Sequence, residues 1–305
     1  MREDSHFLSM EQFLERLDFL DDSGMDQVRF LGGEPTLNPF FPQMVSATQS
    51  AGKKVMVFTN GIMPEASLQC LEILSRDECA IIININDPTE TNPIHFQRQC
   101  ESLRRLGTRC FPGFNIYRPD FDMDFLLPIM REAGCQPVIR VGLAQPCLSG
   151  DNRYIHTSQY QWIGKKLTQF ARVASKQGIR VDFDCGFVPC MFSDQDLSDL
   201  QNMGVGLGWY CSPILDVDIK GKVIHCFPLA QLGEWDLIDF DCADDLRSSI
   251  ENTVHVYRNS GIYPSCVNCE YKSSGICTGG CLSHVIRRFR ILPAKTTIPI
   301  SSCGA

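Results

Sequence analysis

The chain has 305 residues, 44% of them hydrophobic, and a formal net charge of −8, so it can build a folded core of about two ordinary domains or one large barrel with an appendix. Its acidic balance, with a pI near 5.3, argues against a nucleic-acid partner, because binding to a phosphate backbone depends on clustered Lys and Arg. No apolar run reaches the roughly 18 residues of a membrane span and the first residues do not open a signal peptide, which predicts a cytoplasmic protein with no membrane partner.

The first half of the chain alternates predicted helices with predicted strands. Ser9 and Gln12 form a capping box, which predicts a helix from there to Gly24. Short apolar runs predict strands at 28–31, 55–58, 80–83, 114–117 and 138–142, with helices near 40–51, 65–76, 94–106 and 122–133. Nearly continuous apolar strands fit a parallel sheet buried on both faces. An open doubly wound sheet and a βα barrel satisfy this pattern equally well, and both gather functional residues at the carboxyl ends of their strands.

Polar turns follow several of these strands, which makes them candidates for a binding site. In the first turn, two glycines let a ligand approach the backbone closely, and Pro35 holds Glu34 outside the helical region. On these residues alone, a structural turn is as compatible with the pattern as a binding turn. The candidate residues in chain order are Gly32, Gly33, Glu34, Pro35, Thr59, Asn60, Asn84, Asn86, Gly142 and Leu143.

Sixteen cysteines in a chain without an export signal favour metal binding, because a reducing cytosol does not support a disulfide framework. Five of them stand among apolar residues, where a free thiol behaves as a small buried hydrophobic group: Cys70, Cys79, Cys100, Cys110 and Cys135. The densest set is Cys266-x2-Cys269-x7-Cys277-x3-Cys281, which is surrounded by glycines. Four thiolates suit zinc or an iron-sulfur cluster equally well, so a structural zinc site stays open at this point.

Other cysteines surround this set. Cys211 and Cys226 precede it with the spacing Cys-x9-Gly-x4-Cys, and the stretch between them reads as a hairpin that turns at Lys220 and Gly221. Cys185 and Cys190 lie further upstream, and Cys303 follows.

Two of these patterns resemble one known family. Residues 30–37, with Gly32-Gly33-Glu34-Pro35, resemble the motif by which radical S-adenosylmethionine (radical SAM) enzymes hold the amino group of their cofactor. The cysteine order from Cys211 to Cys303 resembles the SPASM domain, which carries auxiliary four-iron four-sulfur (4Fe-4S) clusters. The resemblance implies an α/β protein, with a partial (β/α)6 TIM-like barrel missing its first strand over residues 1–180 and a small cysteine-rich SPASM-like domain over 181–305. It also implies that the polar-turn residues contact S-adenosylmethionine.

The resemblance implies two ligand sets. Matching positions assign Cys211, Cys226 and Cys281 to one cluster, which is one ligand short and which Cys185 or Cys190 could complete. The same matching assigns the other cluster to Cys266, Cys269, Cys277 and Cys303. The seven residues between Cys269 and Cys277, where the family usually has five, are a departure from the pattern.

The family's Cys-x3-Cys-x2-Cys loop does not appear, and the first eight residues hold no cysteine. One interpretation is therefore a radical SAM enzyme that modifies a peptide or protein, receives electrons from a donor partner, and has its start upstream of Met1. The other is a non-catalytic cysteine-rich iron-sulfur or zinc-binding partner protein that has lost the radical cluster. A plain zinc-stabilised α/β protein is a third, and no catalytic residue is assigned in any of them.

Overall fold

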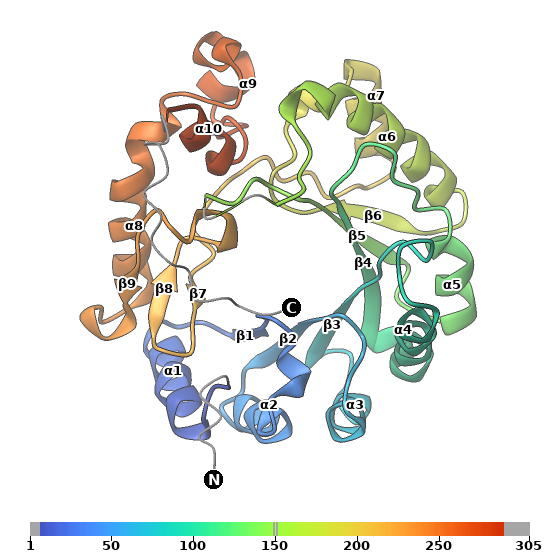
Figure 1. The fold of residues 1–305 in the computed structure, drawn as a ribbon, viewed down its shortest axis with the longest axis vertical. Coiled ribbons are helices and arrows are strands. Elements are labelled where there is room, and N and C mark those ends of the chain that lie inside the picture. The colour runs from blue at the N-terminus through green and yellow to red at the C-terminus, as the bar shows by residue number, and fades with distance from the viewer. Residues whose placement is uncertain (1–6, 149, 151, 290–305) are drawn as a thin grey trace.

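The computed structural model describes residues 7–148, 150 and 152–289, and its largest element is a curved parallel sheet. The strands lie side by side in chain order: β1 (Gln27–Phe30), β2 (Lys54–Thr59), β3 (Cys79–Asn84), β4 (Cys110–Ile116), β5 (Val138–Leu143) and β6 (Arg180–Phe183). The sheet bends into an arc with helices along its outside (Figure 1). Because the strand order never reverses, the arc is an incomplete βα barrel and the doubly wound alternative is wrong.

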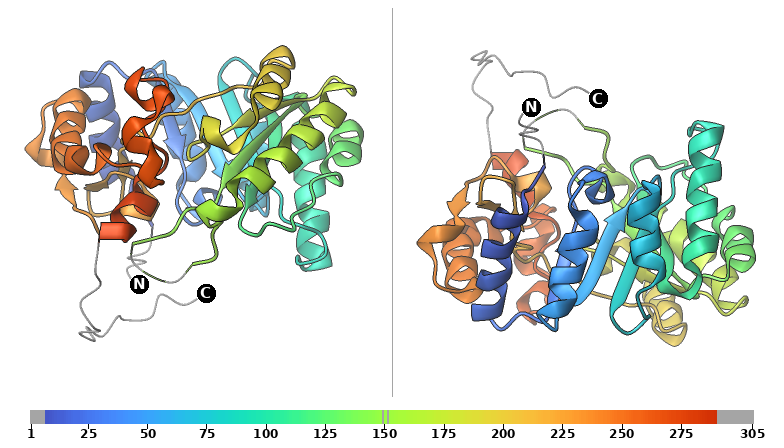
Figure 2. Two further views of the ribbon diagram at one scale, coloured as in Figure 1. Left: turned by 90° about the horizontal axis from the view of Figure 1, so that it is seen from above. Right: turned by 90° about the horizontal axis from the view of Figure 1, so that it is seen from below.

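Seven helices connect or precede the strands in the described part of the chain. They are α1 (Met10–Asp22), α2 (Phe41–Ser50), α3 (Glu65–Glu72), α4 (Pro93–Leu106), α5 (Leu126–Ala133), α6 (Tyr160–Ser175) and α7 (Asp194–Asn202). The capping box is confirmed, since Gln12 N–H donates to Ser9 Oγ at 3.2 Å and Ser9 N–H donates to Gln12 Oε1 at 3.1 Å. The predicted strands and helices are confirmed with shifted ends. In Figure 2, helices α1, α2 and α3 lie side by side with roughly parallel axes.

The two faces of the sheet differ, which corrects the expectation of burial on both. On the convex face, Val57 of β2, Ile81 of β3 and Val141 of β5 are fully buried under the helices. On the concave face, Phe58 and Arg140 remain partly exposed. The concave face looks into the barrel, where six strands do not close the interior.

The tail completes the ring between the two edge strands. Its elements are β7 (Asp216–Val217), β8 (Lys222–Ile224) and β9 (Trp235–Asp236), an antiparallel sheet, and α8 (Ala243–Arg258), α9 (Glu270–Ser273) and α10 (Leu282–Phe289). Figure 1 shows them across the ring from β4 and β5. The predicted hairpin is confirmed: Gly221 turns the chain at φ +80°, a conformation that favours glycine.

Contacts join the tail to both ends of the barrel. At the first end, Arg16 of α1 donates to the backbone oxygen of Asp218 at 2.8 Å. At the other, one continuous core includes Val181 of β6 and Val285 of α10. The strand β6, which the sequence did not single out, extends the sheet to Phe183, so apolar packing crosses the boundary proposed at residue 180.

Short 3-10 turns occupy several connections: η1 (Pro35–Leu37), η2 (Gly107–Arg109), η3 (Thr157–Gln159), η4 (Pro189–Met191), η5 (Phe227–Leu229), η6 (Leu237–Asp239) and η7 (Pro264–Asn268). The turn η4 packs against α6 so closely that a Cβ on Gly164 would lie 2.1 Å from the backbone oxygen of Met191. Among the described residues, no helix combines the length and the apolar character that crossing a membrane requires.

Candidate functional site

The carboxylate of Glu34 ties together the ends of β1 and β2. Its Oε1 accepts hydrogen bonds from the N–H and the Oγ1 of Thr36, at 3.2 and 2.6 Å, and from the Oγ1 of Thr59, at 2.8 Å. Its Oε2 accepts from the N–H of Asn60 at 2.7 Å. Glu34 has the extended backbone expected before Pro35, with φ −133° and ψ 104°. Four of the predicted site residues, Glu34, Pro35, Thr59 and Asn60, therefore lie together at the carboxyl edge of the sheet.

The glycine pair leaves this edge uncovered. Gly32 adopts φ +125°, which other residues rarely take. A Cβ built on Gly33 would meet no atom within 4 Å, so the backbone here is open to an approaching molecule. A side chain at position 33 would therefore fit within the protein itself. The same side chain would clash with a ligand that lies against this backbone.

Asparagines from the next strands fit against glycines on the concave face. A Cβ on Gly113 would lie 2.6 Å from Asn84 Oδ1, and a Cβ on Gly142 would lie 2.4 Å from Asn115 Oδ1. Asn84 Oδ1 is buried and has no hydrogen-bond partner in the described part of the chain. A buried polar atom without a partner is rare, and it suits a site that accepts a hydrogen bond from a bound molecule. The sequence does not single out Asn115, whose only signal is a polar residue near the end of an apolar strand.

The remaining predicted residues lie apart from this group. Leu143 packs with its side chain in the core on the convex side, so only its backbone faces the edge. Asn86 is exposed beyond the end of β3. The buried Gln99 of α4 instead joins the strand ends, because its Nε2 donates to the backbone oxygens of Asn60, at 2.8 Å, and Asn84, at 3.1 Å.

A charged pair stands on the concave face beside these polar residues. Arg140 of β5 is ion-paired with Asp184, which directly follows β6. The Arg140 guanidinium also lies over the ring of Phe58, 5.2 Å from its centroid. Only one signal in the sequence pointed to this pair, a single Arg inside an otherwise apolar strand.

The cysteines of the second half form two groups, and the structure separates Cys185 from Cys190. We call group A the set that contains Cys185, Cys211, Cys226 and Cys281, and group B the set that contains Cys190, Cys266, Cys269 and Cys277. Cys303 lies outside the described residues. The five scattered cysteines are buried or half-buried, as predicted.

In group A the thiols influence one another. Hydrogen bonding from the Cys281 thiol lowers the pKa of Cys211 to about 6. Burial, and then the neighbouring thiols of Cys211 and Cys185, raise the pKa of Cys226. Cys185 is open to solvent on one side, yet the protein around it, Asp184 and the Cys211 thiol raise its pKa to about 12. Cys185 is therefore the thiol that stands with Cys211 and Cys226.

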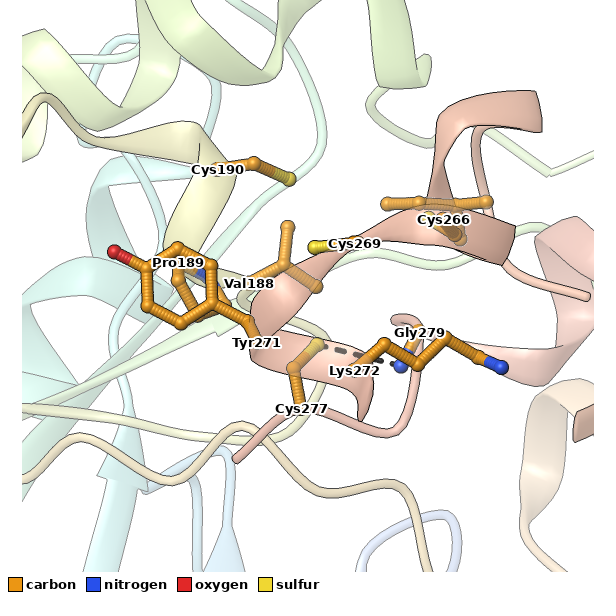
Figure 3. A pocket seen from close by; sticks show the side chains of 10 residues that line it. Val188, Pro189, Cys190, Cys266, Cys269, Tyr271, Lys272, Cys277 and Gly279 are labelled. Atoms are coloured by element: carbon orange, nitrogen blue, oxygen red, sulfur yellow. Dashed lines mark hydrogen bonds between the residues drawn. The ribbon is translucent and has the colours of Figure 1, made fainter. Parts of the chain in front are cut away.

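In group B the four cysteines line one small hollow that opens to solvent (Figure 3). Cys266 and Cys277 are each 8% exposed, while Cys190 is exposed at the mouth. The N–H of Gly279 donates to Cys277 Sγ at 3.3 Å, the interaction dashed in Figure 3. The hollow thus combines four soft sulfur atoms with a backbone donor aimed at one of them.

Glycines bring the group B cysteines close together. Gly275, Gly279 and Gly280 adopt φ values of +74°, +89° and +84°, which favour glycine and turn the chain sharply between Cys269 and Cys281. A Cβ on Gly261 would lie 2.4 Å from the Cβ of Cys266, so only glycine fits there. In the described ranges, no three His, Cys, Asp or Glu side chains converge tightly enough to hold a single metal ion.

Comparisons with known proteins agree with this architecture. No family model matches the sequence. A 54-residue segment is 37% identical to an S-adenosylmethionine-dependent nucleotide dehydratase of Flammeovirga pacifica, but the match spans 18% of this chain and 19% of that protein. Streptococcus suis SuiB, bound to its precursor peptide SuiA, superposes with a TM-score of 0.67 at 14% identity over 94% of this chain and 68% of SuiB. The enzyme anSMEcpe, with AdoMet and the Kp18Cys peptide, superposes with a TM-score of 0.62 at 14% identity over 90% of this chain and 81% of its own.

This chain has the same fold as SuiB and anSMEcpe. The predicted α/β fold with a barrel-like parallel sheet is confirmed at this level, and the sheet has six strands in the described residues. At 14% identity this likeness shows the fold alone.

Proposed function

We propose that this protein binds S-adenosylmethionine at the carboxyl edge of β1 to β5 and iron-sulfur clusters in its tail, and that it takes part in radical chemistry on a peptide or protein substrate. The observation that carries the proposal is the Glu34 carboxylate, fixed by Thr36, Thr59 and Asn60 beside an uncovered glycine turn. When bound, S-adenosylmethionine would supply the radical that attacks a substrate C–H bond. The protein would bind and orient the cofactor and the substrate.

The residues at the edge suit the amino-acid end of this cofactor. Glu34 Oε2 accepts one hydrogen bond, so it keeps capacity to accept another from an ammonium group. Asn84 Oδ1 offers a second acceptor that is buried and unpaired in the described structure. The open side of Gly33 allows a ligand to lie against the backbone. These residues would bind and orient the cofactor without moving a proton.

The tail supports iron-sulfur binding through the chemistry of its donors. Groups A and B each contain four cysteines, the complement of a 4Fe-4S cluster. Four thiolates also suit one zinc ion, so the choice of a cluster rests on the resemblance of the cysteine order to the SPASM domain. Group A takes Cys185 as its fourth member, and an electron donor would then be the expected partner.

The concave face supports a peptide or protein substrate. Arg140 and Asp184 offer a cation and an anion next to the polar edge, and Phe58 adds an aromatic surface. Mixed charge with an aromatic ring suits peptide groups better than a uniformly apolar ligand. The superposition with SuiB in its complex with the precursor peptide SuiA agrees with this choice.

The second candidate is a non-catalytic metal-binding partner protein. The observation that favours it is the pair of four-cysteine groups in the tail, which could bind metal without any turnover of the cofactor. Both candidate functions predict clusters in the tail, so they are distinguished by whether the protein cleaves S-adenosylmethionine.

The test incubates anaerobically purified protein with S-adenosylmethionine and dithionite. We expect the wild type to bind S-adenosylmethionine and Glu34→Ala to lose that binding, and 5′-deoxyadenosine formed by the wild type but not by Glu34→Ala would show that the bound cofactor is cleaved. The matched control is Glu11→Ala, which changes a carboxylate on the surface of α1. S-adenosylmethionine that binds but is never cleaved would support the partner-protein function instead.

A further inference from the structure

Cys190 belongs to a different part of the fold from the cysteines it faces. It lies in η4, after the last strand of the barrel, whereas Cys266, Cys269 and Cys277 lie in the tail around η7 and α9. All four line the same hollow. In Figure 3 the Cys190 side chain reaches across from the barrel side and points toward Cys266 and Cys269.

The position of Cys190 is fixed by its neighbours. Val188 and Met191, on either side of it, are each 1% exposed. Helix α6 packs against this turn at Gly164, which has no side chain and so lets α6 contact the backbone of Met191. A thiol on such a turn is held in place before any metal binds, which is what a ligand position requires.

The tail cysteines are positioned just as firmly. Cys266 has a hydrogen bond from its N–H to the backbone oxygen of Tyr263 at 3.1 Å, and Cys269 caps the start of α9. Cys277 donates from its N–H to the backbone oxygen of Tyr271 at 2.9 Å. Three fixed thiols from the tail and one from the barrel therefore enclose the hollow from opposite sides.

We infer that Cys190 is the fourth protein ligand of a 4Fe-4S cluster held by group B. The inference rests on the proposed function, which assigns clusters to the tail, and it departs from the family pattern, which implied Cys303 in this role. With four protein thiolates the coordination is closed, so this cluster would offer no open iron to a substrate. The cluster would also link the barrel to the tail through bonds from residue 190 to residues 266–277.

The test compares four variants after anaerobic purification: Cys190→Ala, Cys190→Ser, Cys303→Ala and the control Cys242→Ala. Cys242 caps α8 and belongs to neither group. We expect Cys190→Ala to lose about four irons and about four sulfides per chain, while Cys303→Ala and Cys242→Ala keep the wild-type amounts.

Cys190→Ser keeps the size of the side chain and offers an oxygen ligand, so it guards against a folding defect. We expect this variant to retain iron but to show a changed electron paramagnetic resonance spectrum after reduction, which a purely structural residue would not cause. Wild-type iron, sulfide and spectra in both Cys190 variants would overturn the inference, as would loss of the cluster in Cys303→Ala alone. A wild-type protein without iron would contradict the proposed function itself.

Discussion

At the scale of single residues, the candidate cofactor site depends on polar side chains whose hydrogen-bond partners, or lack of them, set what they can bind. Glu34 is fixed because three neighbours donate to its carboxylate, and Asn84 stands out because no neighbour among the described residues donates to its side-chain Oδ1. The glycine turn and the polar strand ends could be predicted from the sequence, since residue type alone indicates them. Asn115 and Arg140 could not, because their role depends on strand register, which places them opposite Gly142, Gly113 and Asp182.

The open space at Gly33 leads to a prediction at this scale. Gly33→Val should weaken S-adenosylmethionine binding about fivefold or more, because extra methyl groups in a close contact cost about 1–3 kcal/mol. The melting temperature should not change, since no protein atom lies within 4 Å of the added Cβ. Titration calorimetry measures the affinity. Gly208→Val is the control, because its Cβ would also meet nothing and its backbone is not left-handed. Equal affinity in the two variants would contradict the site.

At the scale of elements, close packing between α6 and η4 opposes intrinsic helix propensity. Gly164 lies inside α6, where an alanine normally stabilises a helix by about 1 kcal/mol relative to glycine. The backbone oxygen of Met191 would stand 2.1 Å from the new Cβ, so one element has to move. From the sequence alone, a glycine at this position is expected to destabilise α6. The packing shows that the close contact between α6 and η4 requires it.

Gly164→Ala should therefore destabilise the protein by about 2 kcal/mol, the opposite sign to helix propensity. Moving η4 also displaces Cys190, so iron content should fall together with stability. Urea unfolding followed by fluorescence gives the free energy of unfolding, with Gly208→Ala as a neutral control. A Gly164→Ala protein that is more stable than wild type would show that the contact between α6 and η4 relaxes without cost.

At the scale of the whole molecule, local patterns predicted the elements, but long-range contacts decided how they combine. The strands at 55–58 and 80–83 were visible as apolar runs, whereas β6 was not, because it has four residues of which two are charged. Cysteine spacing indicated metal binding in the tail but could not divide Cys185 from Cys190. They are five residues apart in the chain, yet the fold turns one toward Cys211 and the other toward Cys266.

The central claim is that the tail holds two iron-sulfur clusters, one in each group of cysteines. Iron, zinc and acid-labile sulfide in anaerobically purified protein test it most directly, with Cys226→Ala for group A and Cys266→Ala for group B. We predict about eight irons and about eight sulfides per wild-type chain, and about half of each in either variant. Stoichiometric zinc without sulfide in the wild-type protein would contradict the claim.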